Sequence, residues 1–221
     1  HLSLITSGVK SNEEVLIPSL TFVATANSIC YLSAIPHFVD IEQSNLGIDP
    51  KKLDDYLKKN TQRKDNRLIN INTGKVISAL MPVHLFGHSS KIIDLKNIAK
   101  KYDLILIEDA AEALGSFYNR KHLGTFSQVS ALSFNGNKII TTGGGGALIT
   151  NNKSIAKKAR YLATTAKKKH PFKFLHTEIG YNYRMPNINA ALGCSQINKL
   201  NKYLISKRKL ANKYYEVFKE N

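Results

Sequence analysis

The stretch Ser133-Phe-Asn-Gly-Asn-Lys138-Ile-Ile-Thr-Thr-Gly143-Gly-Gly-Gly146 joins two short apolar runs, 130–134 and 147–150, that predict β-strands. Glycine adopts backbone conformations that other residues avoid, and it lets the chain approach a ligand closely. Lys138 is the only charged residue between the two runs. The stretch therefore predicts a strand, a ligand-binding loop that carries one lysine, and a second strand.

Strands and helices alternate along the rest of the chain. Short apolar runs predict strands at residues 14–18, 36–40, 76–83 and 104–107. Helical periodicity and capping residues predict helices at 22–32, from Asp49-Pro50, at 92–102, from Asn152 and from about Pro186. The polar segment 60–75 is predicted to be a surface loop. This alternation predicts an α/β sandwich with a mostly parallel sheet.

Two reactive groups follow predicted strands. In Leu104-Ile-Leu-Ile-Glu-Asp109-Ala-Ala-Glu112 an apolar strand ends in acids, and Lys138 follows a later strand. Ligands of parallel sheets bind at the carboxyl ends of the strands. A deprotonated lysine amine can attack an aldehyde, and a carboxylate can keep a pyridine nitrogen protonated. These are the two groups that pyridoxal phosphate (PLP) chemistry needs.

These segments resemble the DegT/StrS family of sugar aminotransferases, PLP enzymes of fold type I that aminate keto sugars on nucleotides. Three further segments carry the resemblance, which covers nearly the whole chain: Pro18–Asn27, Pro82–Gly87 and Gly180–Ala191. The resemblance implies the large domain of a fold-type-I PLP transferase, with three α/β/α layers around a mostly parallel sheet. It also implies PLP as the cofactor.

The resemblance assigns roles to five residues. Lys138 matches the lysine that anchors PLP and then carries the proton between substrate and cofactor carbons. Asp109 matches the partner of the pyridine nitrogen, and Ser133 matches a hydroxyl that binds the cofactor phosphate. Phe22 matches the aromatic ring that covers the cofactor face, although a Phe in an amphipathic helix is often a core residue. Asn182 matches a residue that reaches the cofactor phosphate of the neighbouring subunit.

Three other positions are less defined. Glu112 matches a position near the phenolic oxygen of the cofactor, but relatives commonly carry Gln or His there, so its role stays open. His84 is interpreted as a structural histidine at a strand end rather than as a catalytic base. Arg184 either binds substrate or supports a dimer, and the sequence does not separate these roles.

The formal net charge of +16 suggests a different class of function, a basic nucleic-acid-binding module. The lysines are nevertheless scattered, which favours a solvated surface, and the same field would attract an anionic nucleotide sugar. One cluster, Lys167-Lys168-Lys169-His170, has the composition of a phosphate site. Cys30 and Cys194 are predicted to be free, buried thiols.

The boundaries of the chain predict a fragment. It begins at His1 within an apolar run and ends in helical sequence at Asn221. The resemblance implies that residues 1–200 form an N-terminally truncated PLP-binding large domain, and that residues 201–221 lead towards a small C-terminal domain outside the fragment. No apolar run approaches the roughly 20 residues that span a bilayer, and no secretory signal is recognised. A cytoplasmic protein without membrane or nucleic-acid partners is therefore predicted, and the resemblance, through Asn182, implies a homodimer.

The predicted reaction is transamination of a nucleotide-linked keto sugar. The variant of the lysine loop most resembles members that act on UDP-linked 4-keto-6-deoxy-N-acetylhexosamines, with glutamate as the amino donor. The choice between amination at carbon 3 and carbon 4 stays open. Lys138 argues against the sugar dehydratase branch, in which histidine replaces the lysine. A non-catalytic regulator with the same fold and a nucleic-acid-binding module are the alternatives.

Overall fold

The computed structural model describes residues 1–219, which divide into two compact units. The first unit contains residues 1–132 and 148–184, and the second contains residues 133–147 and the chain from Met185 onward. Among residues 1–219, no helix combines the length and the apolar character that crossing a membrane requires.

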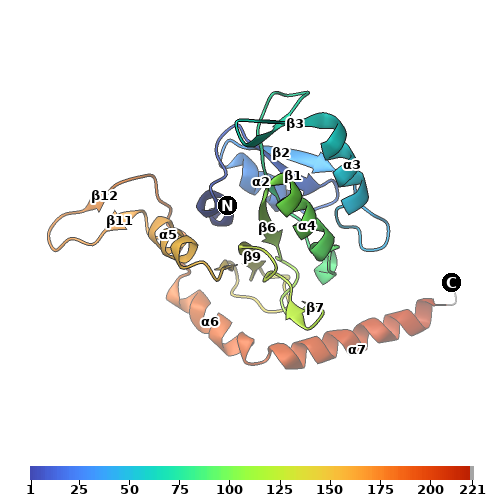
Figure 1. The fold of residues 1–221 in the computed structure, drawn as a ribbon. Coiled ribbons are helices and arrows are strands. Elements are labelled where there is room, and N and C mark those ends of the chain that lie inside the picture. Colours follow the sequence, from blue (N-terminus) through green and yellow to red (C-terminus); the bar gives the residue numbers. More distant parts are fainter. Residues whose placement is uncertain (220–221) are drawn as a thin grey trace. The chain divides into compact units, whose positions relative to one another are not determined.

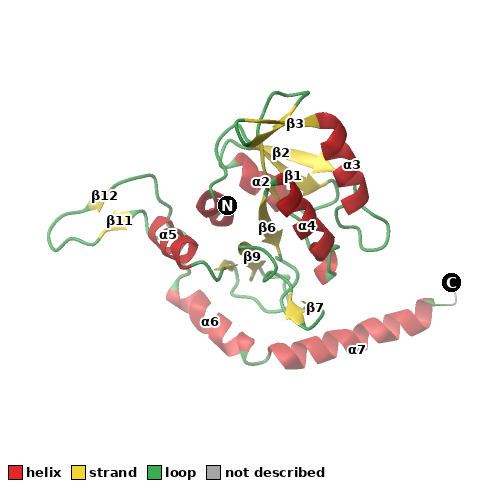
Figure 2. Ribbon diagram, viewed as in Figure 1, coloured by secondary structure: helices red, strands yellow, loops and turns green. Residues whose placement is uncertain are grey.

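A central sheet of six strands organises the chain, with the order β10-β9-β6-β5-β1-β2. Its strands are β1 (Glu14–Pro18), β2 (Ile35–Val39), β5 (Ile77–Leu80), β6 (Ile105–Asp109), β9 (Val129–Ser133) and β10 (Gly146–Ile149). The pairs β1/β2, β1/β5, β5/β6 and β6/β9 are parallel, and Figure 2 shows the strands in yellow. The predicted fold class, α/β with a mostly parallel sheet, is confirmed.

Helices cover both faces of this sheet (Figure 1). On one face α1 (Leu2–Ser7), α2 (Val23–Cys30) and α5 (Lys153–Ala163) contribute to a buried apolar cluster with alternate residues of the strands. The cluster includes Leu4, Val15, Ile17, Ile29, Ala79, Ile107, Val129 and Ile155. On the other face α3 (Pro50–Asn60) packs against α4 (Ile92–Tyr102), in line with right-handed connections between parallel strands.

Two helix starts follow the predicted caps. Asp49 precedes Pro50, and its Oδ1 accepts the N–H groups of Lys51 at 2.9 Å and Lys52 at 3.1 Å. Asn152 does the same for the first turn of α5, where its Oδ1 accepts N–H groups at 2.9 and 3.2 Å. Each side chain satisfies donors that have no partner within the helix.

Several predicted segments are corrected. Residues 60–75 are not an irregular loop, because β3 (Thr61–Lys64) and β4 (Arg67–Asn70) form a hairpin. Its turn is made by Asp65 and Asn66 at φ 50° and 60°, the two positive values of a type I′ turn. Helix α2 begins at Val23, so Phe22 is its N-cap rather than part of an amphipathic helix.

Other differences concern the end of the chain and the thiols. The single helix expected from about Pro186 is two helices, α6 (Asn187–Ile197) and α7 (Leu200–Phe218). Cys30 and Cys194 are free as predicted, but the prediction that they are buried is wrong. Cys30 is the last residue of α2, where its neighbour Ile29 takes the core position.

Short elements that the apolar pattern did not predict occur between the main ones. They are η1 (Leu85–Gly87) and two hairpins, β7 (Phe117–Tyr118) with β8 (Lys121–His122), and β11 (Lys167–Lys168) with β12 (Leu175–His176). Two-residue strands are too short to carry a period-two signal.

Candidate active site

Asp109 is the last residue of β6 and lies at the carboxyl edge of the sheet, half-buried. Its backbone N–H donates to Pro82 O at 2.9 Å, and its carbonyl accepts the N–H of His84 at 3.0 Å. Its side chain is held separately: Oδ2 accepts the hydroxyl of Thr25 at 2.7 Å, and Oδ1 accepts the N–H of Ala111 at 3.1 Å. The main chain and the carboxylate are therefore both fixed before any ligand binds.

Phe22 lies at the start of the helix that carries Thr25. It is the N-cap of α2 with extended φ and ψ of −70° and 141°, and its side chain is 75% exposed. An aromatic ring in the core would be buried, so the interpretation of Phe22 as a core residue is excluded. An exposed ring on a rigid helix start presents a surface on which a flat ligand can stack.

Glu112 accepts a hydrogen bond from the corner that follows β5, the short 3-10 turn η1 at Leu85–Gly87. Its Oε2 accepts the N–H of Phe86 at 2.7 Å. Phe86 has φ 54° and ψ 20°, a left-handed conformation that costs a bulky residue about 1–3 kcal/mol. Gly87 follows at φ 79°, and a Cβ there would lie 2.9 Å from Glu112 O. Glu112 thus positions this corner, a role that the sequence did not indicate.

His84 belongs to a wholly buried pair with Glu108. Both side chains are 0% exposed, and His84 Nε2 lies 2.9 Å from Glu108 Oε2. The N–H of Ser90 donates to His84 Nδ1 at 3.3 Å, so Nδ1 is the acceptor and Nε2 carries the hydrogen. This tautomer and complete burial support the structural interpretation of His84.

Glu108 also accepts hydrogen bonds from the loop that precedes β9. Its oxygens accept the N–H groups of Gly124 at 2.8 Å, Phe126 at 2.8 Å and Ser127 at 2.7 Å, and the Ser127 hydroxyl at 2.8 Å. Burial alone would raise the pKa of Glu108. The hydrogen bonds from His84, Ser127 and Gly124 more than offset it and hold the pKa below its usual value of 4.5.

We expect replacement of Glu108 to be the most destabilising change in this network. Glu108→Ala leaves buried donors unpaired and should lower the free energy of unfolding by about 3–5 kcal/mol. Glu108→Gln keeps the shape of the side chain but loses its charge, and it should lower the free energy of unfolding by about 1.5–3 kcal/mol. The measurement is urea unfolding at neutral pH. Glu178→Gln, which removes a surface partner of Lys158, is the control and should change stability by under about 1 kcal/mol.

The pH dependence of this effect has a defined sign. A carboxyl whose folded pKa is depressed stabilises the protein above its unfolded pKa, and the stabilisation is lost as pH falls through the folded pKa. The wild type should therefore lose stability as the pH drops below about 4.5, the usual value of this group. Glu108→Gln should lose less over the same interval. An equal loss in both proteins would contradict the assignment.

Lys138 lies in the second unit, half-buried at the tip of a closed loop. Phe134 O accepts both the N–H of Thr142 at 2.9 Å and the hydroxyl of Thr141 at 3.1 Å, which closes the segment at its base. The N–H of Lys138 donates to Asn135 O at 3.0 Å. The backbone that carries the lysine is thus fixed by local hydrogen bonds.

Helix α6 supports the same loop within the second unit. The N–H of Thr141 donates to Gln196 Oε1 at 2.9 Å. Gly145 has φ 124°, a conformation that favours glycine at this point of the run. Ser133, the last residue of β9, accepts the N–H of Asn135 with its Oγ at 3.3 Å.

Comparison with known proteins is consistent with this arrangement. The model of the DegT/DnrJ/EryC1/StrS aminotransferase family matches residues 1–221. The chain belongs to this family. The members are PLP-dependent enzymes, so the resemblance noted from the sequence motifs is confirmed.

Two curated relatives and one solved structure show how similar this chain is to known members of the family. GDP-perosamine synthase of Escherichia coli O157:H7 is 36% identical over 214 residues, which cover 97% of this chain and 54% of the synthase. The UDP-4-amino-4,6-dideoxy-N-acetyl-beta-L-altrosamine transaminase of Campylobacter jejuni subsp. jejuni serotype O:23/36 (strain 81-176) is 36% identical over 222 residues, 100% of this chain and 55% of the transaminase. The solved structure of Helicobacter pylori PseC, an aminotransferase involved in the biosynthesis of pseudoaminic acid, matches with a TM-score of 0.83 and 30% identity, over 100% of this chain and 56% of PseC. The chain thus spans about half the length of these relatives.

The residues of this DegT/StrS chain fit PLP in their donor chemistry. Each oxygen of Asp109 accepts one protein hydrogen bond, and a carboxylate oxygen has two lone pairs, so acceptor capacity remains for a ring N–H. Phe22 offers an exposed ring on the helix that supports Asp109. In the second unit, Ser133 ends β9 and Lys138 lies in the loop that follows it. Asp109, Phe22 and Glu112 thus belong to the first unit, and Ser133 and Lys138 belong to the second.

Asn182 lies in the first unit, beyond the β11–β12 hairpin. It forms an isolated antiparallel bridge with Thr164, at the end of α5. Arg184 follows it and is exposed. The bridge fixes the backbone at Asn182, and the residue is exposed.

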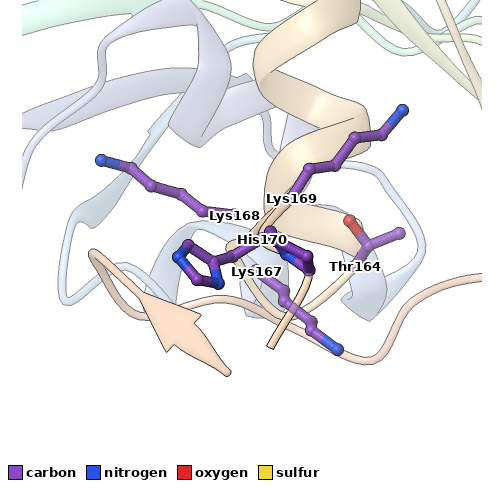
Figure 3. A pocket seen from close by; sticks show the side chains of 6 residues that line it. Thr164, Lys167, Lys168, Lys169 and His170 are labelled. Carbon is purple, nitrogen blue, oxygen red and sulfur yellow. The ribbon is translucent and has the colours of Figure 1, made fainter. Parts of the chain in front are cut away.

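The lysine cluster lies on the same hairpin. A hollow of about 580 Å³ is lined by Thr164, Lys167, Lys168, Lys169, His170 and Pro171. Figure 3 shows the three ammonium groups pointing in different directions. Lys167 Nζ lies 3.9 Å from the centre of the Phe174 ring, and His170 Nδ1 accepts two backbone N–H groups of the hairpin turn. The lysines therefore do not converge on one anion, and part of the cluster serves the hairpin itself.

The sequence missed two contributors to the site. Thr25 contacts Asp109 although 84 residues separate them, and Phe86 contacts Glu112 across 26 residues. The signal for Thr25 was a hydroxyl in the segment that contains Phe22, but only the tertiary structure, in which α2 packs on β1 and β2, shows that this hydroxyl reaches Asp109.

Proposed function

We propose that the whole protein is a PLP-dependent aminotransferase of a nucleotide-linked keto sugar. The observation that carries the proposal is the carboxylate of Asp109, fixed by Thr25 and Ala111 at the end of a central parallel strand. Membership of the aminotransferase family, together with the closed loop that carries Lys138, supports the same activity.

The cofactor would supply an electron-accepting ring that stabilises the carbanion left when a C–H bond breaks. Asp109 would hold the proton on the ring nitrogen. Lys138 would anchor the cofactor and, when released, its amine would move a proton between carbon atoms. Phe22 would cover one face and exclude water, and Ser133 would donate to the phosphate. Each of these roles is part of the proposal.

Three further roles complete it. Glu112 would act through the corner that it holds at Phe86 rather than only by direct contact with the cofactor. Asn182 would contact the cofactor phosphate of a second copy of the chain, which makes a homodimer part of the proposal. The net charge of +16 would raise the local concentration of an anionic nucleotide sugar.

The finer assignment is the substrate. We propose a UDP-linked 4-keto-6-deoxy-N-acetylhexosamine, with glutamate as the amino donor, in the cytoplasm. One relative is named for a UDP-linked sugar and another for a GDP-linked sugar at the same 36% identity, so identity alone does not select the nucleotide. The motif of the lysine loop supports the UDP-linked choice.

Turnover by the whole protein on a panel of keto sugars tests this function. We expect amination of the UDP-linked N-acetylated keto sugar at least about tenfold more efficiently, as kcat/KM, than of its GDP-linked counterpart, a difference of roughly 1.4 kcal/mol in transition-state binding. Amination of only the GDP-linked sugar would overturn the proposed substrate but not the reaction. PLP binding without any turnover would favour a non-catalytic regulator, and salt-sensitive DNA retention without PLP binding would favour a nucleic-acid-binding module.

A further inference from the structure

Thr25 is a buried polar residue with a defined target. Thr25 lies in the first turn of α2 and is 3% exposed. Its Oγ1 lies 2.7 Å from Asp109 Oδ2. Its second partner is Thr21, four residues earlier and just before the N-cap of the helix, with 2.7 Å between the two hydroxyl oxygens. A buried hydroxyl with two short contacts is fully engaged and is costly to remove.

The direction of these hydrogen bonds follows from the number of hydrogens. An ionised carboxylate only accepts, so the single hydroxyl hydrogen of Thr25 is donated to Asp109. Thr25 can then only accept from Thr21, which makes Thr21 the donor of the second bond. The chain therefore runs from Thr21, which is half-buried, through Thr25 to the carboxylate. Hydrogen bonds in such a series polarise one another in the same direction.

The second donor to Asp109 comes from a different element. Ala111 N–H binds Oδ1 at 3.1 Å, whereas Thr25 binds Oδ2 at 2.7 Å. Two donors on the two oxygens define the plane of the carboxylate, and one lone pair on each oxygen remains for a ligand. The same helix start also carries Phe22, so α2 sets both the exposed ring and the orientation of the carboxylate.

We propose that Thr25 is a positioning residue that orients the carboxylate of Asp109, with Thr21 behind it. The inference rests on the proposed role of Asp109 toward the cofactor ring. Thr25 acts only through Asp109, and its contribution is the hydroxyl hydrogen bond rather than the volume of its side chain.

The test compares Thr25→Val, which keeps the shape and loses the hydroxyl, with Thr25→Ser, which keeps the hydroxyl. Thr61→Val is the matched control. Within the described part of the chain, the Thr61 hydroxyl donates only to Leu57 O, at 2.6 Å. Three quantities are measured on the whole protein: the PLP dissociation constant without substrates, the pH at which the visible absorbance of bound PLP titrates, and kcat. If Thr25→Val does not fold, the same three quantities are measured on Thr25→Ala.

We expect Thr25→Val to lower kcat by about 10- to 100-fold, the range that a lost hydrogen bond to a charged group gives. The absorbance titration should move away from its wild-type pH, and the PLP dissociation constant should rise. Thr25→Ser and Thr61→Val should stay within about threefold of the wild type, because the hydrogen bond to Asp109 persists in both. Thr21→Val should give a smaller loss than Thr25→Val, since it removes only the donor behind Thr25.

Two outcomes would overturn the inference. An unchanged titration in Thr25→Val would show that the hydroxyl does not act on the cofactor through Asp109. Equal impairment of Thr25→Ser and Thr25→Val would show that packing, not the hydrogen bond, is what matters. Asp109→Asn separates this inference from the proposed function: if Asp109→Asn is fully active the function assignment fails, whereas impaired Asp109→Asn with normal Thr25→Val removes only Thr25.

Discussion

Lys138→Ala is expected to abolish aminotransferase turnover while the protein remains folded. The proposed reaction needs an amine at this position twice, first to anchor the cofactor and later to move a proton between carbon atoms. Loss of a positioned proton-transfer group alone costs about 10²- to 10⁴-fold in rate. The loop should persist in the variant, because Phe134 O, Thr141 and Thr142 close it through hydrogen bonds that do not involve the lysine side chain.

The measurement combines initial rates with chemical trapping. Borohydride reduction of the PLP-loaded wild type should fix the cofactor on Lys138, as read by peptide mass spectrometry. Lys138→Arg should be as inactive as Lys138→Ala, because a guanidinium keeps the charge but cannot be deprotonated to act as the nucleophile. Lys153→Ala, an exposed lysine in the first turn of α5, is the control and should be fully active. Trapping on a different lysine would remove Lys138 from the mechanism.

Asp109→Asn is expected to retain PLP but to lose about 10²-fold or more in kcat, a loss typical of removing one preorganised electrostatic partner. An amide supplies no negative charge to keep the ring nitrogen protonated. The fold should tolerate the change, because the hydroxyl of Thr25, which now donates to Oδ2, can turn to accept from an amide NH₂ at that position.

The control for this variant is Asp103→Asn. Asp103 is exposed at the C-terminal end of α4, at φ 57°, a left-handed conformation that asparagine also adopts readily. Activity of this variant should equal that of the wild type. Wild-type turnover in Asp109→Asn, measured at saturating PLP and substrate, would show that Asp109 has no role in the chemistry.

Local patterns predicted much of the fold correctly. The strand at 14–18 and the helix at 92–102 have the predicted bounds, and Asp49 and Asn152 cap the helices that they were expected to open. These features depend on interactions between residues a few positions apart, such as a cap with the next turn, so their energetics are visible in a short window of sequence. The hairpin at 61–70 was missed because both its strands are mostly polar and its turn is Asp-Asn rather than Asn-Gly.

The sequence by itself determined the family, the α/β class and the position of Asp109 at a strand end and of Lys138 in a glycine-flanked loop. Only the tertiary structure showed how the carboxylate is held. Thr25, at the start of a helix that packs on β1 and β2, donates to Asp109 at the end of β6. Phe86 reaches Glu112 because the exit of β5 lies next to that of β6, and Glu108 pairs with His84 across the same two strands. These contacts join residues 24 to 84 positions apart, and their energy depends on the order of strands in the sheet. No local pattern encodes that order, so the chemical groups were evident from the sequence and their supports were not.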